Sequence, residues 1–280
     1  MNILIAILFL ALPLLSCGCA TRAVQTEELL ASTNGLPLQY EITNIAFIDQ
    51  AAGYCGPSTL TMAMRFAGQD VSVDEIARQV FIPGLQGSLQ EDLIGASRRQ
   101  GLMAIPIRNL RALLTEVANG HPVIVFKNLG LSWAPRWHYA LVLGYDFKRQ
   151  KIIMHSGHDA FLHWDLRKFE RSWRLGDYWG LVVLPAGGLA SSADEMAHVA
   201  AAVGLEIAHK YNEAAKSYRM ILEKWPRNLV ALIGLANLSY SRGNLNEAIT
   251  LLRRAIQAHP DSTAARHNLS VAEQSLKYPL

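Results

Sequence analysis

Cys55 is the residue of this chain best suited to nucleophilic chemistry. The sequence has three cysteines, and the other two, Cys17 and Cys19, follow an apolar N-terminal run. Pro57 stands where the first turn of a helix accepts proline, and an apolar stripe at helical spacing continues from Leu60. The pattern predicts a helix that begins at Cys55, where the macrodipole and the free amide groups favour a thiolate over a thiol.

A thiolate nucleophile needs an imidazole partner from another part of the chain. His138 opens an apolar run through Tyr145, which predicts a strand with the imidazole at the sheet edge, facing the N-terminus of the helix. Gln50, five residues before Cys55, is placed to direct its side-chain amide toward an oxyanion beside the Cys55 amide. The sequence therefore predicts Cys55 as a nucleophile, His138 as a base and Gln50 as an oxyanion donor.

The segments around Cys55 and His138 resemble the double-glycine leader peptidases, the bacteriocin-processing branch of the papain-like cysteine peptidases. The resemblance spans roughly residues 38–184 and depends on Gln50, on Cys-Gly-Pro at a helix start, and on the His-initiated strand that ends in Gly-Tyr-Asp. It implies that Cys55 is the nucleophile, His138 the general base and later acid, and Gln50 the oxyanion donor. The implied reaction is peptide cleavage through a thioester; the family typically cuts after a small, often double-glycine, site.

The chain departs from this family at the residue that orients the imidazole. The family carries Asp or Asn on the strand after the histidine, whereas Ser156 stands nearest to that position here. Asp159, three residues beyond, and Asp146, at the end of the histidine strand, are the alternatives. Because serine orients an imidazole weakly, the sequence leaves open a slow or degenerate enzyme.

No cofactor, metal or nucleic-acid site is predicted. His155, His158 and His163 match no common zinc spacing, and strand alternation places the first two on opposite faces. The chain has no G-x-x-x-x-G-K-[ST] motif, which excludes a P-loop nucleotide site. Its 26 basic and 23 acidic residues leave a formal charge of +3, which excludes a strongly basic nucleic-acid-binding protein.

Residues 37–186 carry helix signals followed by strand signals. Capping boxes at Ser72–Glu75 and Ser88–Glu91 predict two helix starts, and Gly101 predicts the end of the second helix. Five segments have strand patterns, and the short connections among the last three predict antiparallel pairing: 102–107, 123–126, 139–145, 151–155 and 178–184. The predicted fold of this domain is α+β and papain-like, with helices and an antiparallel sheet.

Residues 192–280 predict an all-α tetratricopeptide (TPR) solenoid. Asn-Glu-Ala at 212–214 recurs at 246–248, and Trp225-Pro226 recurs as His259-Pro260, both after 34 residues. His209 occupies the turn-glycine position of a degenerate first unit, and a helix at 263–276 caps the stack. The repeats either bind a protein partner in their groove or stabilise the first domain or a dimer.

The N-terminus predicts a lipoprotein signal over residues 1–19. An apolar run too short to span a bilayer leads into Leu-Leu-Ser before Cys17, which resembles a lipobox, with Cys19 as the alternative lipidation site. Neither cysteine is followed by aspartate, which by resemblance implies the outer membrane, facing the periplasm. A plain secretory signal or a membrane helix end is the other interpretation, and residues 20–36 are predicted to be a polar tether.

These patterns predict a lipid-anchored cysteine peptidase of the bacterial cell envelope, which acts on a peptide or protein while its repeats recruit substrate or a partner. Two alternatives remain. The same dyad can transfer an acyl group to an amine or hydrolyse a non-peptide amide. The second alternative is a non-catalytic scaffold. The missing aspartate favours this interpretation, whereas the presence of Cys55, His138 and Gln50 opposes it.

Overall fold

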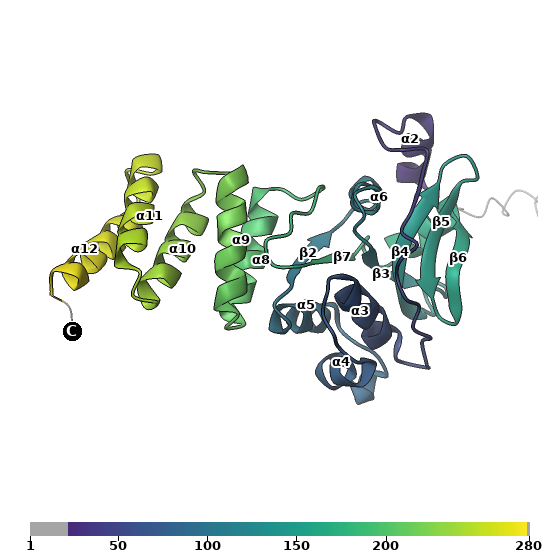
Figure 1. Cartoon of the computed structure of the whole chain (residues 1–280). Coiled ribbons are helices and arrows are strands. Elements are labelled where there is room, and N and C mark those ends of the chain that lie inside the picture. Colours follow the sequence, from purple (N-terminus) through teal and green to yellow (C-terminus); the bar gives the residue numbers. More distant parts are fainter. Residues whose placement is uncertain (1–21, 279–280) are drawn as a thin grey trace, which may run out of the picture.

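A computed structural model describes residues 22–278, in which a domain of helices and one sheet is followed by a stack of helices (Figure 1). The strands are β1 (Gln39–Glu41), β2 (Met103–Ile107), β3 (Val123–Asn128), β4 (Trp137–Asp146), β5 (Lys151–Ser156), β6 (Asp159–Asp165) and β7 (Gly180–Leu184). They form a seven-stranded sheet in the order β2-β7-β3-β4-β5-β6, with β1 added to β4. Every pairing is antiparallel, so the predicted fold class is confirmed.

All five predicted strands are present, but one of them pairs differently from the prediction. The connection from β5 to β7 contains β6 and the helix α7 (Leu166–Arg174), so β7 pairs with β3 and β2 instead of continuing the hairpins. Strands β1 and β6 were not predicted. Strand β1 is only three residues long, and β6 is a largely exposed edge strand without an apolar alternation.

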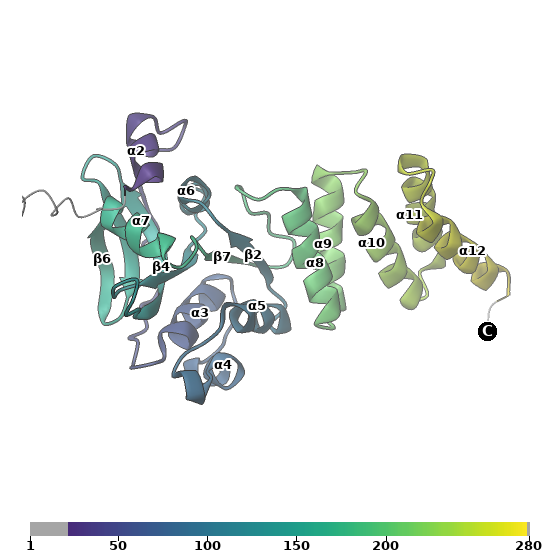
Figure 2. The ribbon, with the colours of Figure 1, turned by 180° about the vertical axis from the view of Figure 1, so that it is seen from behind.

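Two sets of helices cover the two faces of the sheet, and alternate strand residues serve each face. In β4, Tyr139, Leu141 and Leu143 pack with α3 (Cys55–Phe66), α4 (Val73–Val80) and α5 (Gln90–Arg99). The intervening Ala140 and Val142 pack with α6 (Leu110–Ala118) and α7. Figures 1 and 2 show α3, α4 and α5 gathered on the side of the sheet away from α6. The period-two alternation of β4 thus builds two apolar cores.

The two predicted capping boxes have different outcomes. Ser72 accepts a hydrogen bond from the Glu75 amide and caps α4 as predicted. Ser88 does not cap α5, because α5 begins at Gln90 and the Ser88 hydroxyl is buried without a partner among residues 22–278. A Cβ at Gly56 would lie 2.6 Å from Ser88 Oγ, so Ser88 is packed against the start of α3 instead.

The predicted tether is wrong for the described residues from 22 onward, because they contain a docked helix. Helix α2 (Val24–Ala31) packs on α6 and α7, and Leu29 is buried. The buried carboxylate of Glu170 accepts hydrogen bonds from the amides of Gln25 and Thr26, at 3.1 and 2.7 Å, and so satisfies the free amides of the helix start. This partner is 144 residues away in the chain, which is why the local sequence did not reveal it.

The repeats follow the predicted period. Helices α8 (Glu195–Ile207), α10 (Leu229–Ser241) and α12 (Thr263–Lys277) begin 34 residues apart, and so do α9 (Tyr211–Lys224) and α11 (Leu245–Ala258). The residue before each of α8, α10 and α12 caps it: Asp194, Asn228 and Ser262. His209 has a φ of 59° at the turn where Gly243, one repeat later, has 77°.

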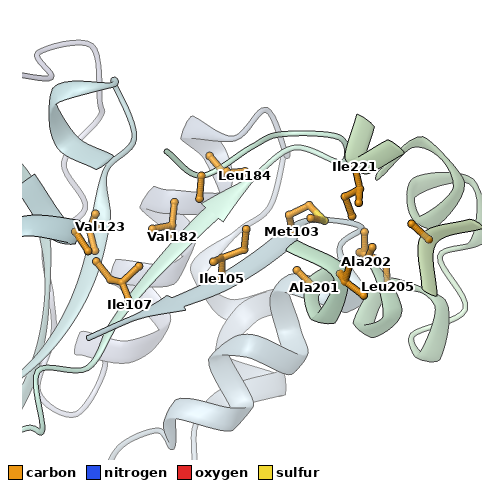
Figure 3. Close-up of a cluster of buried hydrophobic side chains, with 14 of the residues drawn as sticks. Met103, Ile105, Ile107, Val123, Val182, Leu184, Ala201, Ala202, Leu205 and Ile221 are labelled. Atoms are coloured by element: carbon orange, nitrogen blue, oxygen red, sulfur yellow. The ribbon is translucent and has the colours of Figure 1, made fainter. Parts of the chain in front are cut away.

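The domain and the repeats share one continuous core. Figure 3 shows Met103 and Ile105 of β2 beside Ala201, Ala202 and Leu205 of α8. The helices also approach closely, since a Cβ at Gly204 would collide with the Arg98 side chain of α5. The repeats are therefore packed on the edge of the sheet, and the boundaries predicted near 186 and 192 remain a prediction.

No helix within residues 22–278 is long and apolar enough to cross a membrane. The predicted signal at 1–19, with Cys17 and Cys19, lies outside the described residues.

Candidate active site

Cys55 is the first residue of α3, as the sequence predicts, and its side chain is half-buried. Burial raises the pKa of the Cys55 thiol, although hydrogen bonding to the backbone of Tyr139, Gly56 and Cys55 itself acts in the opposite direction. Desolvation therefore opposes the thiolate that the helix start favours, and the direction of the pKa shift corresponds to a neutral Cys55 thiol at neutral pH.

Gln50 is held firmly between α3 and the turn after β5. Its Nε2 donates to Thr59 Oγ1 at 2.9 Å, and its Oε1 accepts from the Gly157 amide at 2.9 Å. Thr59 lies one helical turn beyond Cys55, so the carboxamide of Gln50 is fixed beside the first turn of α3. One hydrogen on Nε2 remains for an oxyanion.

His138 is the second residue of β4 and is half-buried. Its Nε2 lies 3.0 Å from Ser156 Oγ, which leaves Nδ1 as the ring nitrogen without a partner in the described part of the chain. Burial, reinforced by the positive charges of Lys127 and Arg136, lowers the pKa of His138 to about 4. The imidazole is thus a neutral base at neutral pH.

Cys55 and His138 lie on two elements that pack against each other, α3 and β4. Tyr139 directly follows His138 in β4, and its backbone acts to lower the pKa of the Cys55 thiol. No hydrogen bond joins Cys55 to His138 among residues 22–278. Catalytic hydrogen bonds are often long in a protein without its substrate and tighten when the substrate binds.

Ser156 is the candidate orienting residue that contacts His138. Asp146 lies at the opposite end of β4, where its carboxylate accepts from the Arg149 amide at 2.9 Å. Asp159 is exposed at the start of β6 and pairs across the hairpin with Ser156 through the backbone. Neither aspartate is hydrogen-bonded to His138 in the described structure.

Lys127 is a site residue that the sequence analysis missed. It pairs with His138 across β3 and β4, and its side chain is 1% exposed. Its Nζ lies 3.4 Å from Ser156 Oγ and 4.1 Å from the centre of the Trp164 ring. Burial, with a smaller contribution from the charge of Lys168, lowers the pKa of Lys127 to about 7. The only local signal is a lysine that ends an apolar run, which resembles an ordinary strand end.

The histidines considered for a metal site lie apart. His155 is buried between Phe47 and Phe161, and its Nδ1 accepts from the Phe161 amide at 3.1 Å. His158 is exposed and lies 2.6 Å from Asp49. Within residues 22–278, no three His, Cys, Asp or Glu side chains converge to hold a metal ion.

A groove of about 470 Å³ lies beside Lys127, whereas a cavity of about 640 Å³ lies at β1 and shares no lining residue with the site. Trp164, which contacts Lys127, lines the groove together with Leu131, Lys168 and Arg171.

Asn128 holds the adjoining loop, because its Oδ1 accepts from the amides of Gly130 and Arg136, both at 2.8 Å. The loop is ordered by these bonds, yet its Trp133 is 80% exposed.

Comparison with known proteins identifies the part of the chain that carries this site. Residues 42–178 match the Peptidase_C39 like family. The matched segment contains Gln50, Cys55, Lys127, His138 and Ser156, so all of the site lies within the C39-like domain. Residues 206–271 match the tetratricopeptide repeat, which confirms the TPR prediction. No curated protein matches the chain.

Three solved structures are similar to the C39-like domain at low identity. A protein named as a C39-like peptidase from Bacillus anthracis is 15% identical, with a TM-score of 0.44 over 52% of this chain and 97% of that one. A double glycine motif protease from an AMS/PCAT transporter, in complex with a leader peptide, is 18% identical, with a TM-score of 0.40 over 52% and 94%. The peptidase domain of Streptococcus ComA, a bi-functional ABC transporter, is 18% identical, with a TM-score of 0.42 over 51% and 99%.

Proposed function

We propose that this protein is a cysteine peptidase that cleaves a peptide or protein by thiol acyl transfer. The observation that carries the proposal is the arrangement inside the C39-like domain: the Cys55 thiol stands at the start of α3, and α3 packs against β4, the strand that carries His138. Gln50 is fixed beside the same helical turn, and Ser156 holds the imidazole. These are the parts that acyl transfer from a peptide needs.

The resting protonation states determine how the reaction starts. Because the thiol and the imidazole are both neutral, His138 Nδ1 takes the Sγ proton as Sγ attacks the peptide carbonyl. The oxyanion that forms accepts hydrogen bonds from the Cys55 amide and Gln50 Nε2. The imidazolium then gives its proton to the amine nitrogen, the C–N bond breaks, and a thioester remains. Water, deprotonated by His138, attacks the thioester, which releases the acid product and the Cys55 thiol.

The match of residues 42–178 to the Peptidase_C39 like family supports a peptide as the substrate. The groove beside Lys127 is lined by Trp164, Lys168 and Arg171, and Cys55 and His138 are not among its lining residues. The TPR helices support recruitment of a protein partner, with a hollow of about 340 Å³ between α10 and α12 lined by Tyr240, Leu252 and Val271. We further propose lipid attachment at Cys17, with Cys19 as the alternative. The protein would then lie at the bacterial outer membrane, facing the periplasm; the lipobox-like sequence supports this location.

A non-catalytic scaffold is the second candidate, and two observations favour it. Burial raises the pKa of the Cys55 thiol, and a serine occupies the position where the resembling family carries Asp or Asn. Transfer of the acyl group to an amine, with the same dyad, is the third candidate. All three share one structure and differ in whether Cys55 forms an acyl-enzyme and in what removes the acyl group.

The test compares the protein with its Cys55→Ala variant against a peptide library read by mass spectrometry. We expect cleavage, an acyl adduct on Cys55, and a loss of cleavage by at least about 1,000-fold in the variant. A Gln50→Ala variant should lose about 100-fold in cleavage per folded molecule, and it should also melt at a lower temperature, because Thr59 and the Gly157 amide lose their buried partner. Added hydroxylamine separates hydrolase from transferase, since a transferase passes the acyl group to amines in preference to water. If the protein neither cleaves a peptide nor forms an adduct on Cys55, the peptidase proposal fails and the scaffold becomes the proposed function.

A further inference from the structure

Three buried or half-buried side chains form a continuous chain of contacts behind the candidate nucleophile. Lys127 Nζ lies 3.4 Å from Ser156 Oγ, and Ser156 Oγ lies 3.0 Å from His138 Nε2. The only ring nitrogen of His138 left for the thiol is Nδ1. Whether Nδ1 carries a lone pair or a proton therefore depends on the direction of the hydrogen bonds in this chain.

Within this chain of contacts, His138 Nε2 and a neutral Lys127 Nζ are the two groups that can accept the single hydroxyl proton of Ser156, so two directions of hydrogen bonding satisfy that proton when His138 is neutral. A charged Lys127 has three donors and no acceptor, so it donates to Ser156 Oγ. Ser156 then donates its hydroxyl proton to Nε2, and the proton of the imidazole resides on Nδ1, where it prevents His138 from acting as a base. A neutral Lys127 has a lone pair that accepts from Ser156. Ser156 then accepts from Nε2–H, and Nδ1 holds the lone pair that takes the thiol proton.

We propose that Lys127 is a positioning residue of this site, which acts through Ser156 to select the His138 tautomer that can deprotonate Cys55. This role rests on the cysteine-peptidase function proposed above. It also accounts for a serine at the orienting position, because a hydroxyl can reverse its hydrogen bond whereas an aspartate, which only accepts, cannot. The base is thereby switched on by the loss of one proton from a lysine.

The surroundings of Lys127 make its neutral form accessible. Its side chain is 1% exposed and contacts Met154 Sδ at 3.4 Å and the Trp164 ring. The charged groups that face it and its partner are Lys168 from α7, Arg136 from the loop before β4, and His138 itself. No carboxylate forms an ion pair with Lys127 in the structure described. Burial among cations brings the pKa of Lys127 to about 7, so both forms exist near neutral pH.

A Ser156–Lys127 nucleophile pair is the alternative use of these contacts. Ser156 is only 7% exposed and its hydroxyl is already shared between Lys127 and His138. A peptide carbonyl cannot reach it, whereas Cys55 is half-buried at the helix start. The geometry therefore favours a relay over a second nucleophile.

The first experiment follows the tautomer of His138 in the full chain by ¹⁵N nuclear magnetic resonance, with His138→Ala to assign the signal. As the pH rises through about 7, we expect the proton to move from Nδ1 to Nε2 in the wild-type protein. In Lys127→Arg, which keeps a permanent donor, Nδ1 should stay protonated across the same range. In Lys127→Met the change near pH 7 should vanish. A wild-type tautomer that is constant through this range would overturn the proposal.

The second experiment measures peptide cleavage against pH in the same proteins. Wild-type activity should rise through about pH 7, and Lys127→Arg should be at least about tenfold slower above that pH. Adding Lys127→Arg to Ser156→Ala should cause no further loss, because the relay is already cut. If Lys127 were merely structural, Lys127→Met would keep the wild-type pH profile whatever its melting temperature. If no peptide is cleaved by the wild-type protein, the proposed function fails while the tautomer measurement still decides the relay.

Discussion

The C39-like domain and the TPR repeats each bury a histidine or its polar neighbours, and the two groups are bonded in different ways. Beside the repeats, His198 and Ser217 bond to backbone: His198 Nε2 accepts from the Ala190 amide at 3.0 Å, and Ser217 Oγ accepts from the Gly187 amide at 3.0 Å. In the domain, Lys127, Ser156 and His138 bond to one another. The first kind of contact completes secondary structure, whereas the second leaves protons and lone pairs that can be exchanged.

This difference teaches how to tell a structural histidine from a reactive one. His198 is fully buried and has both ring nitrogens bonded to backbone groups, Nδ1 to the Asp194 carbonyl at 2.6 Å and Nε2 to Ala190. His138 is half-buried, uses one nitrogen for a side chain, and leaves the other without a partner in the described part of the chain. A buried position with two satisfied nitrogens supports the fold, and a spare nitrogen near a thiol supports chemistry.

The largest predicted effect is the loss of peptide cleavage when His138 of the C39-like domain is replaced. His138→Ala should lower kcat/KM for peptide cleavage by about 10²- to 10⁴-fold, because the base is lost. Its melting temperature should change little, since the ring is half-buried and holds only Ser156. Steady-state kinetics and thermal unfolding of the same preparation check both expectations.

His198→Ala is the matched control on the repeat side. It should lower the free energy of unfolding by about 2–4 kcal/mol, because it leaves a cavity and frees the buried Ala190 amide. Cleavage per folded molecule should not change. If His198→Ala impaired cleavage as much as His138→Ala does, the distinction between the two histidines would be wrong.

Replacement of Glu116, which lies at the junction of the two regions, should cause a loss of stability of intermediate size. It is fully buried, and its carboxylate bonds to His121 Nδ1 at 2.7 Å and to the Ser192 amide that leads into the repeats. Burial acts to raise the pKa of Glu116, but the hydrogen bonds from His121 and Ser192 prevail and hold it below its ordinary value of 4.5. Glu116→Gln should therefore cost about 1–3 kcal/mol at neutral pH, measured by urea unfolding.

The pH dependence of the Glu116 contribution has a definite direction. Since the folded pKa is the lower one, the stabilisation is present above pH 4.5 and is lost as the pH falls through the folded value. The difference in stability between the wild-type protein and Glu116→Gln should shrink on acidification below pH 4.5. A difference that stays constant with pH would mean that the charge of Glu116 does not matter.

The smallest effect concerns the two equivalent turns of the repeats. His209 has a φ of 59° and Gly243 a φ of 77°, in the region that favours glycine. His209→Gly should raise the free energy of unfolding by about 0.5 kcal/mol, and Gly243→His should lower it by about 1 kcal/mol. Chemical denaturation of each single variant measures the two changes in the free energy of unfolding. Equal effects of the same sign would show that the turns are not equivalent.

Much of the architecture was predictable because it depends on neighbours in the chain. The helix start at Cys55, the strand at His138 and the 34-residue period of the repeats all follow from local patterns that the structure confirms. Ser156 was also located from the sequence, through the position of the strand after His138. Local hydrogen bonding and apolar periodicity act over a few residues, so they can be read directly from the order of the residues.

The sequence by itself therefore determined which elements form and which side chains are chemically able to react. Only the tertiary structure decided the docking of α2 on Glu170, the pairing of β7 with β3, and the contact of Lys127 with Ser156. It also decided that Cys55 rests as a thiol. These features depend on burial and on partners far apart in the chain, and the dielectric around a titratable group exists only once the surrounding core has packed.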